Sequence, residues 1–258
     1  MLRLFIIGLA LSTTTPVWRD RINRIDSRSR VVPQSATSAS YTFCATALTA
    51  GNRTGTWGCI NGDGSAPSGD NLGPWVVSGS PSSTTGTTCA SPSYLTFDAS
   101  PDYVQSTTAV GSTPAAFTIC SLWQQQTGTG LLQTGWFWGV YPCCGSFVTL
   151  SEESVVFIGY FPSSVSSAVS VAANDKALVC GSYSGGTAHV YVRTLGGTFN
   201  YASSAASPPS VANSKFTFGS DGVYTNTGKF FGGFYTEKEL SQSDMDAIYD
   251  AVIGSGCT

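Results

Sequence analysis

The chain has 258 residues, which is enough for one full-sized β-sandwich with extensions or for two small domains. Hydrophobic residues make up 41% of the sequence and allow a substantial core, but charged residues make up only 10%, against roughly 25% in an average soluble protein. The surface must therefore be covered mainly by Ser, Thr, Asn, Gln and Gly. Such a surface is more typical of an extracellular or particle-bound protein than of a cytosolic enzyme.

The amino-terminal residues are first apolar and then basic. Residues 1–11 read MLRLFIIGLAL, a run too short to span a membrane, so we do not expect a transmembrane protein. Residues 1–30 hold six Arg and two Asp, a net charge of +4, whereas the remaining residues carry a net charge of −7. Two interpretations stay open: an uncleaved basic arm that anchors residues 1–35 on an acidic neighbour, or a signal peptide without an A-x-A site. Such an arm attracts nucleic acid only non-specifically, so no specific nucleic-acid partner is expected.

Composition divides the chain into three predicted parts. Residues 1–40 form a basic N-terminal arm or linker, 41–90 a small Gly-, Ser- and Thr-rich region that contains cysteines, and 91–258 a β-sandwich. The eight cysteines are even in number and irregular in spacing, which favours disulfides, and Cys44 and Cys59 could close a local loop. Cys143 and Cys144 are adjacent, and each is expected to pair elsewhere, because a bridge between neighbours strains the peptide. A single histidine and the lack of a C-x-x-C pair argue against zinc.

From Tyr94 onward the sequence consists of short β-type runs separated by turn residues. The alternation in residues 188–193 places His189, Tyr191 and Arg193 on one face of a strand, and Gly196-Gly197 predicts a hairpin turn into 198–201. Because strands and helices do not alternate, the pattern predicts an antiparallel sandwich or barrel. The clearest predicted strands are residues 116–123, 155–159, 177–180, 188–193, 198–201, 216–218 and 230–235.

One helix is predicted, at the C-terminal end of the chain. Ser241 is expected to be its N-cap and Asp244 its third residue, where a carboxylate favours the positive end of a helix. Gly254 is expected to follow the last turn. An apolar stripe at helical spacing should pack on the sandwich; it consists of Met245, Ile248, Tyr249 and Val252.

Four stretches, in this order, resemble the concanavalin A-like lectin/glucanase superfamily, and specifically its LamG-like jelly rolls. Residues 94–105 (YLTFDASPDYVQ) resemble an opening strand pair, 117–123 and 131–134 the next inner strands, 189–197 (HVYVRTLGG) a middle strand with its hairpin, and 230–249 (FFGGFYTEKELSQSDMDAIY) the final strand and helix. The resemblance implies an all-β fold, an antiparallel jelly-roll β-sandwich with one short C-terminal helix, preceded here by an extended N-terminal arm. The chain departs from the family pattern at Arg193-Thr194, where Asp-Gly is usual, and it lacks a W-H-H-V strand. Both departures argue against an inherited metal site.

No arrangement for catalysis is predicted. Glucanases of that superfamily carry paired carboxylates on one strand, about 5 Å apart, and no such strand occurs here. Glu152 and Glu153 are adjacent, so in a strand they would point to opposite faces. His189 is the one candidate for a Ser-His-Asp arrangement and is expected to be structural. We therefore expect no catalytic residues, that is, a protein that is not an enzyme.

No cofactor is expected, with calcium the one possibility weighed. The oxygen-rich run 61–65, together with Asp70, departs from an EF-hand, which needs Gly at the sixth position and Glu at the twelfth. Asp98 and Asp102 match acidic positions of the family's opening loop. There they would hold calcium or, as we favour, cap turns.

The candidate ligand-binding residues are Trp136, Trp138 and Tyr141. They lie in a segment bounded by Gly and Pro, 133–145 (QTGWFWGVYPCCG), in which Trp136 and Trp138 have strand spacing and share a face. Sugar rings have apolar faces that stack on Trp and Tyr. The alternative is that this face belongs to the core.

These observations predict a non-catalytic glycan-binding or adhesion module, displayed extracellularly or on a virion surface, whose partner is a carbohydrate or a cell-surface glycan. The alternative is a structural virion component, such as a phage tail-fibre or decoration protein, whose N-terminal arm contacts other particle subunits. A secreted glycan hydrolase with a divergent site is the third and least favoured hypothesis.

Overall fold

The computed structural model describes residues 30–32, 42–98, 102–125, 132–138, 147–150, 155–160, 163–168, 171, 174–206, 214–219 and 227–254. The strands within 30–32 and 132–168 are described by their backbone pairing alone. Most of the predicted N-terminal arm lies outside the described residues, as do Tyr141, the pair Cys143-Cys144 and the pair Glu152-Glu153.

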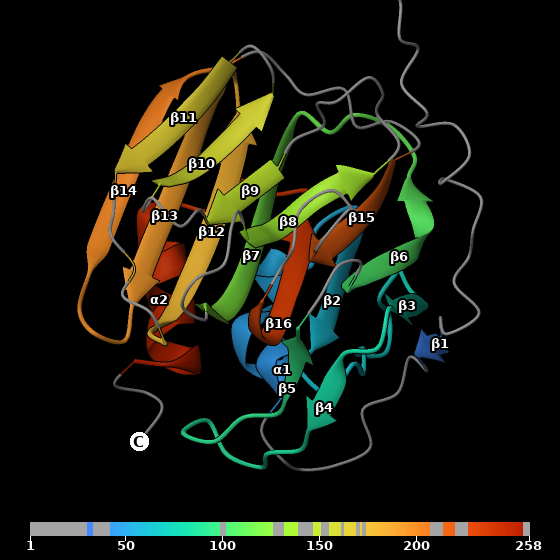
Figure 1. Cartoon of the computed structure of the whole chain (residues 1–258). Coiled ribbons are helices and arrows are strands. Elements are labelled where there is room, and N and C mark those ends of the chain that lie inside the picture. Colours follow the sequence, from blue (N-terminus) through green and yellow to red (C-terminus); the bar gives the residue numbers. More distant parts are fainter. Residues whose placement is uncertain are drawn as a thin grey trace, which may run out of the picture.

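Two antiparallel sheets form the fold (Figure 1). Sheet A contains, in spatial order, β1 (Arg30–Val32), β3 (Trp75–Ser78), β6 (Tyr103–Val110), β15 (Ser214–Gly219), β8 (Leu132–Trp138), β9 (Phe147–Leu150), β10 (Val155–Tyr160) and β11 (Ser163–Ala168). Sheet B contains β14 (Phe199–Ala205), β13 (Thr187–Thr194), β12 (Lys176–Ser184), β7 (Ala116–Gln125), β16 (Gly228–Thr236), β5 (Tyr94–Phe97) and β4 (Ser82–Thr84), and β2 (Trp57–Asn61) pairs with the second half of β16. The predicted all-β, antiparallel jelly-roll sandwich is confirmed.

The predicted strands are present, and most extend further than predicted. Residues 177–180 become the nine-residue strand β12, because β7 and β13 continue the hydrogen-bond ladder beyond the hydrophobic run. The predicted hairpin joins β13 to β14, with Gly197 at a φ of 93°. The strand pair expected within residues 94–105 needs correction: β5 pairs with β16 and β6 pairs with β15, so the two strands lie in different sheets.

The inner core lies between the two sheets and is rich in aromatic side chains. Phe117, Trp123 and Phe230 of sheet B and Trp75 and Phe218 of sheet A are all fully buried in it. The Phe218 ring of sheet A and the Phe230 ring of sheet B lie with their centroids 5.1 Å apart, which links the two layers. These contacts hold the sheets face to face.

A second core covers the outer face of sheet B, away from sheet A (Figure 1). The helices α1 (Phe43–Ala47) and α2 (Gln242–Val252) pack there, over Leu122 and Leu178 of the sheet. The predicted stripe of α2 is confirmed, because Met245, Ile248, Tyr249 and Val252 are all buried. Sheet B is therefore covered on both faces, which explains why β12 has seven buried residues out of nine and no alternating pattern.

Disulfides reinforce the outer core. Cys120 and Cys180 are register partners on β7 and β12 and are bonded to each other beneath the helices. Cys44 and Cys59 join α1 to β2, which confirms the predicted local loop. Cys89 is disulfide-bonded as well, and its Sγ lies 3.3 Å from the Val252 carbonyl oxygen at the end of α2.

The helix α2 begins as predicted. The Ser241 side chain accepts a hydrogen bond from Asp244 N at 3.2 Å, and the Asp244 carboxylate accepts one from Ser241 N at 2.9 Å. These two bonds form a capping box. Gly254 follows the C-cap residue Ile253, and a Cβ at Gly254 would come within 2.7 Å of the Asp250 Cα, so the position requires glycine for space. The five-residue helix α1 is too short to show a helical period and was not predicted.

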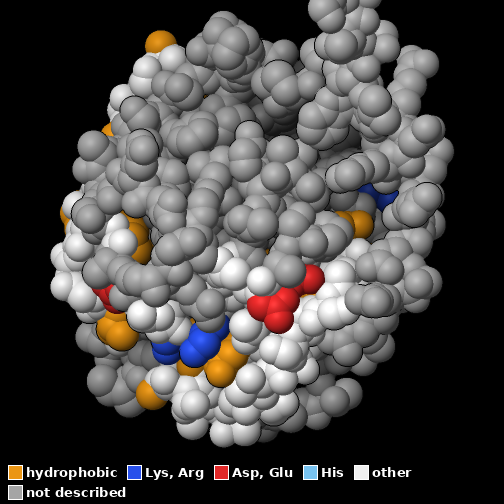
Figure 2. Space-filling model, viewed as in Figure 1, with side chains coloured by type: hydrophobic (Ala, Val, Ile, Leu, Met, Phe, Trp, Pro, Cys, Tyr) orange, Lys and Arg blue, Asp and Glu red, His pale blue; other side chains and the backbone are white. Residues whose placement is uncertain are grey.

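The region 41–90 packs on the sandwich and supplies strands to both sheets. Its strands β2 and β4 pair with β16 and β5 in sheet B, and β3 pairs with β6 in sheet A. On the other side of β3 lies β1, the described piece of the N-terminal arm. In the described part of the chain, no helix is long and apolar enough to cross a membrane. Figure 2 shows one face of the molecule, on which the described charged side chains form small separate groups.

A buried carboxylate holds the region 41–90 together. Asp70 is only 5% exposed, and its oxygens accept hydrogen bonds from the backbone N–H groups of Cys59, Leu72 and Gly73 and from the indole N–H of Trp75. Burial raises the pKa of Asp70, although these bonds act in the opposite direction. The Asp70 side chain therefore holds β2, the loop before β3 and the Trp75 ring of the inner core in fixed positions.

We expect Asp70→Ala to lower the free energy of unfolding by about 3 kcal/mol or more, because buried N–H donors lose their acceptor. Urea denaturation at neutral pH measures the loss. Asp63→Ala is the matched control: Asp63 is exposed, accepts one hydrogen bond from Ser65 N, and should change stability by less than about 1 kcal/mol. Equal losses for the two variants would contradict the role given to Asp70.

The capping box predicts a pH dependence. The hydrogen bonds from the backbone N–H and side chain of Ser241 hold the pKa of Asp244 below its ordinary value of 3.8. A depressed carboxyl pKa stabilises the folded state above pH 3.8, and this contribution is lost as the pH falls through the folded-state value. Asp244→Ala should therefore cost about 1 kcal/mol at pH 7 and much less well below pH 3.8. Urea denaturation of both proteins at the two pH values checks this, and a pH-independent difference would refute it.

Candidate functional site

Two of the three predicted aromatic residues, Trp136 and Trp138, lie on β8 in the middle of sheet A. In the backbone register, Trp136 pairs with Thr217 and Trp138 with Lys215, both on β15. Tyr141 lies outside the described residues. The assignment of Trp136, Trp138 and Tyr141 as ligand-binding residues stays a prediction.

The acidic residues weighed as calcium ligands are engaged with protein donors. Asp102 is buried, and its two carboxylate oxygens accept hydrogen bonds from the backbone N–H groups of Ser80 and Asp98, whereas Asp98 itself is exposed. In the run 61–65, the Asn61 side-chain oxygen accepts from Cys44 N. Within the described ranges, no three His, Cys, Asp or Glu side chains come together as a metal cluster would require. The Asp102 carboxylate therefore ties together two backbone N–H groups of this region.

The most chemically varied surface of the described chain lies along β13 and β14. The register places Tyr191 opposite Tyr201 and Arg193 opposite Phe199, on the outer face of sheet B, with His189 on the same side one step further along β13. Two carboxylates reach this face from elsewhere: Glu239 from the link between β16 and α2, and Asp246 from α2. We call this set the β13–β14 strip; it consists of His189, Tyr191, Arg193, Phe199, Tyr201, Glu239 and Asp246.

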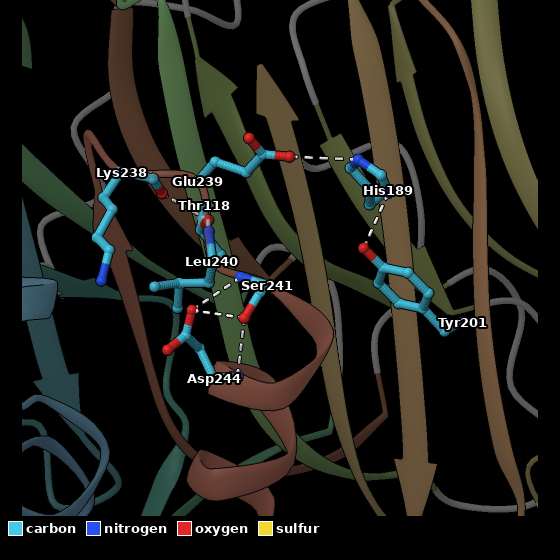
Figure 3. Close-up of polar contacts among 8 residues, drawn as sticks. All are labelled: Thr118, His189, Tyr201, Lys238, Glu239, Leu240, Ser241 and Asp244. Atoms are coloured by element: carbon cyan, nitrogen blue, oxygen red, sulfur yellow. Dashed lines mark hydrogen bonds and ion pairs between the residues drawn. The ribbon is translucent and has the colours of Figure 1, made fainter. Parts of the chain in front are cut away.

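At one end of the strip, His189 lies between Glu239 and Tyr201 (Figure 3). Its Nε2 is 3.2 Å from Oε1 of Glu239, and its Nδ1 is 2.9 Å from the Tyr201 hydroxyl. A neutral imidazole that donates from Nε2 to the carboxylate can only accept at Nδ1, so the Tyr201 hydroxyl is then the donor. The His189 and Tyr201 rings are stacked, 5.4 Å between centroids and 10° between planes. His189 therefore joins β13 to Glu239 and orients the Tyr201 ring at the surface.

At the other end, Asp246 joins two residues of β13. Its Oδ1 accepts from the Tyr191 hydroxyl at 2.9 Å and from Arg193 Nη1 at 2.7 Å. The Arg193 guanidinium lies 4.2 Å from the centre of the Tyr249 ring and 6.0 Å from that of Phe199. Burial, together with the hydrogen bond to Asp246 and its negative charge, raises the pKa of Tyr191, which keeps this hydroxyl protonated as a donor. The arginine is thus fixed by a carboxylate and two rings.

A clamp on β7 sets the position of Glu239. The Thr118 hydroxyl donates to the Lys238 carbonyl at 2.7 Å and accepts from Leu240 N at 2.9 Å, so it holds both residues that flank Glu239 (Figure 3). Leu240 is fully buried in the outer core, and the capping box at Ser241 follows immediately. The link between β16 and α2 is therefore held rigidly, and it directs Glu239 onto β13.

The strip presents apolar and polar groups side by side. The Phe199 side chain is 45% exposed, and Tyr201 is half-buried beside it on the edge strand β14. Burial, followed by the negative charge of Glu239, raises the pKa of Tyr201, so its hydroxyl also stays protonated. Such a surface suits a ligand that has both an apolar face and several hydroxyl groups.

Sequence reasoning found part of this strip. The alternation in β13 correctly placed His189, Tyr191 and Arg193 on one face, and the predicted hairpin brought β14 beside them. Glu239 and Asp246 were missed, because their positions depend on how α2 and its link pack on the sheet rather than on any local pattern. The register of the hairpin could have added Phe199 and Tyr201.

No protein-family model matches this sequence, and no curated protein matches it significantly. Solved structures do share its fold. Domain 4 of the extracellular arabinanase AbnA from Geobacillus stearothermophilus, of family GH43 and in complex with arabinotriose, is similar with a TM-score of 0.55 and 15% identity, over 74% of this chain and 96% of that one.

Two further similar structures are of proteins whose chains are longer than this one. The ligand-binding domain of botulinum neurotoxin serotype D, in complex with N-acetylneuraminic acid, gives a TM-score of 0.54 and 10% identity, over 74% of this chain and 50% of that one. The sialidase of Trypanosoma rangeli, in complex with sialic acid, gives a TM-score of 0.53 and 14% identity, over 88% of this chain and 36% of that one. At these identities the comparisons establish a shared β-sandwich fold.

The cluster around Asp246 generates a stability prediction. Asp246→Ala removes the acceptor of the buried Tyr191 hydroxyl and the ion-pair partner of Arg193, so it should cost about 2 kcal/mol of unfolding free energy in urea denaturation. Asp250→Ala removes another carboxylate from the same helix, where it lies near the negative helix end, and should change stability by less than about 0.5 kcal/mol. A loss at Asp246 no larger than at Asp250 would mean that the cluster does not order the strip.

Proposed function

We propose that this chain is a non-catalytic glycan-binding module of the concanavalin A-like, LamG-like type, displayed on a surface for adhesion. The observation that carries the proposal is the β13–β14 strip, in which the exposed Phe199 and the half-buried Tyr201 stand beside an oriented carboxylate and guanidinium. An aromatic ring contacts the apolar face of a sugar, while carboxylate and guanidinium groups bond its hydroxyls. The predicted residues Trp136, Trp138 and Tyr141 are proposed as a second aromatic platform on sheet A.

The comparisons support this proposal at the level of the fold. The structure of the arabinanase domain is a complex with arabinotriose, and that of the neurotoxin domain is a complex with N-acetylneuraminic acid. Sandwiches of this shape therefore carry sugar sites in other proteins. The disulfides and the low content of charged residues support a location outside the cytosol, at the cell exterior or on a virion surface.

The absence of catalysis is part of the proposal. Glu239 is paired with His189, and Asp246 is shared by Tyr191 and Arg193, so both carboxylates of the strip are engaged in holding other side chains. A glycan hydrolase needs one carboxylate as an acid and a second as a base or nucleophile. A sialidase is nevertheless among the similar structures, so hydrolysis of the bound glycan should be assayed with the wild type and with Glu239→Gln.

A structural virion component is the second candidate, and one observation favours it. Residues 1–30 carry a net charge of +4 on an otherwise acidic chain, and the piece of the arm at Arg30–Val32 is hydrogen-bonded to sheet A as the edge strand β1. A basic arm joined to a sheet edge could tie the sandwich to an acidic neighbouring subunit. The two candidates are compatible, because a particle protein can display a glycan-binding sandwich.

Binding to a glycan array, followed by calorimetry with the best neutral oligosaccharide, tests the proposal. Phe199→Ala and Tyr201→Ala should each weaken binding about tenfold, which corresponds to the loss of about 1.4 kcal/mol of ring contact. Tyr103→Ala is the matched control, since Tyr103 is a half-buried tyrosine on sheet A. It should leave binding unchanged.

The outcomes separate the candidate surfaces. If Trp136→Ala and Trp138→Ala abolish binding while Phe199→Ala and Tyr201→Ala do not, the module binds glycans through sheet A and the strip is not its site. If the folded wild-type protein binds no oligosaccharide on the array, the proposed function is wrong.

A further inference from the structure

The helices leave one margin of the outer face of sheet B uncovered. Lys229 on β16, Gln124 on β7 and Lys176 on β12 are direct register partners, so they form one row across three adjacent strands. Their side chains lie on the same face as Leu122 and Leu178, two residues further along their strands. That next row is buried under the outer core, whereas the Lys–Gln–Lys row is only half-buried.

Each lysine of this row stands against an aromatic ring. The Lys229 ammonium lies 4.7 Å from the centre of the Tyr94 ring, and the Lys176 ammonium lies 5.0 Å from the centre of the Phe231 ring. The two rings themselves are in contact, with centroids 5.5 Å apart. We call these residues the two-lysine patch; it consists of Tyr94, Gln124, Lys176, Lys229 and Phe231. In Figure 2, basic and hydrophobic side chains lie side by side in the lower part of the view.

The positive charge of the patch is not neutralised by the described protein groups. Residues 31–258 carry a net charge of −7, yet within the described ranges the ion pairs involve His189 with Glu239 and Arg193 with Asp246, and neither Lys176 nor Lys229. Burial lowers the pKa of Lys176, and the charge of Lys229 lowers it further. Two like charges thus stand close together at a half-buried position in an acidic protein, an arrangement that a bound anion would stabilise.

We infer that the two-lysine patch binds the anionic substituent of an acidic sugar, a carboxylate or a sulfate, while the sugar ring lies against Tyr94. Across the three strands, the Cα atoms of the two lysines are about 10 Å apart, so both flexible side chains can reach one anionic group between them. Tyr94 is half-buried, so part of its side chain is open to a sugar ring, and Gln124 is held in place by a hydrogen bond from its amide to the Asn174 carbonyl. Two lysines on an acidic body are too few for a nucleic-acid backbone, which favours an anionic sugar over a polyanion. The inference rests on the proposed glycan-binding function and adds the substrate class.

The test compares matched neutral and acidic ligands with the full chain. Calorimetry with lactose, 3′-sialyllactose and 3′-sulfolactose should show at least about tenfold tighter binding of the two acidic sugars. Lys176→Gln and Lys229→Gln should remove that preference, so that the acidic sugars bind each variant no more tightly than lactose does. Arg53→Gln is the matched control, because Arg53 is an exposed cation over a different aromatic ring, that of Trp57, outside all the proposed sugar-binding surfaces. Urea denaturation of each variant establishes that it is folded.

Each outcome decides between the two proposals. Equal affinity for lactose and the acidic sugars, or the same loss of affinity in Arg53→Gln, would overturn the two-lysine patch and leave glycan binding intact. If no sugar binds, the proposed function falls, and a titration with inorganic sulfate, followed by NMR at the two lysines, then tests the anion site by itself. If the wild-type protein binds sulfate and the variants Lys176→Gln and Lys229→Gln do not, the patch is an anion site that does not act on glycans. If sulfate leaves the spectra of the wild-type protein unchanged, the anion site is overturned as well.

Discussion

The burial of sheet B on both faces is the constraint on which the rest of this structure depends. Its inner face packs against sheet A through aromatic rings, and its outer face packs against α1 and α2. A strand covered on both sides cannot alternate apolar and polar residues, so the seven buried residues of β12 follow one another without interruption. The disulfide between Cys120 and Cys180 lies at the centre of the outer core, where it ties two of these strands together.

The same constraint determines how the surface groups are oriented. Because the outer core must be closed, the link from β16 to α2 is pinned at Thr118 and Leu240, and Glu239 has to emerge beside His189. Asp246 lies at the edge of the α2 stripe, where it is half-buried, and meets Tyr191 and Arg193. The polar groups of the strip thus owe their fixed positions to apolar packing a few residues away, which is how a rigid scaffold pre-organises a binding surface.

The sequence was informative wherever a signal is local. The N-cap at Ser241, the stripe from Met245 to Val252 and the hairpin at Gly197 all depend on neighbours within a few residues, and each was predicted correctly. The partners of β5 and β6, the placement of β2 and β3 and the arrival of Glu239 at His189 depend on contacts between distant segments, which no local pattern encodes. Lys176 and Lys229 illustrate the same limit: they are 53 positions apart and become neighbours only through the register of β12, β7 and β16.

Helix length explains why both surfaces lie at the margins of the outer face. The helix α2 has 11 residues and is therefore about 16 Å long, whereas the nine residues of β12 span about 30 Å. A helix of that length cannot cover the strands from end to end, so a row of outward side chains must stay exposed where the cover stops. Evolution can change those residues without opening either core, since their neighbours in the next row carry the packing. The two-lysine row and the exposed Phe199 of the β13–β14 strip occupy such positions, which are places on this scaffold where ligand-binding chemistry can be added at little cost in stability.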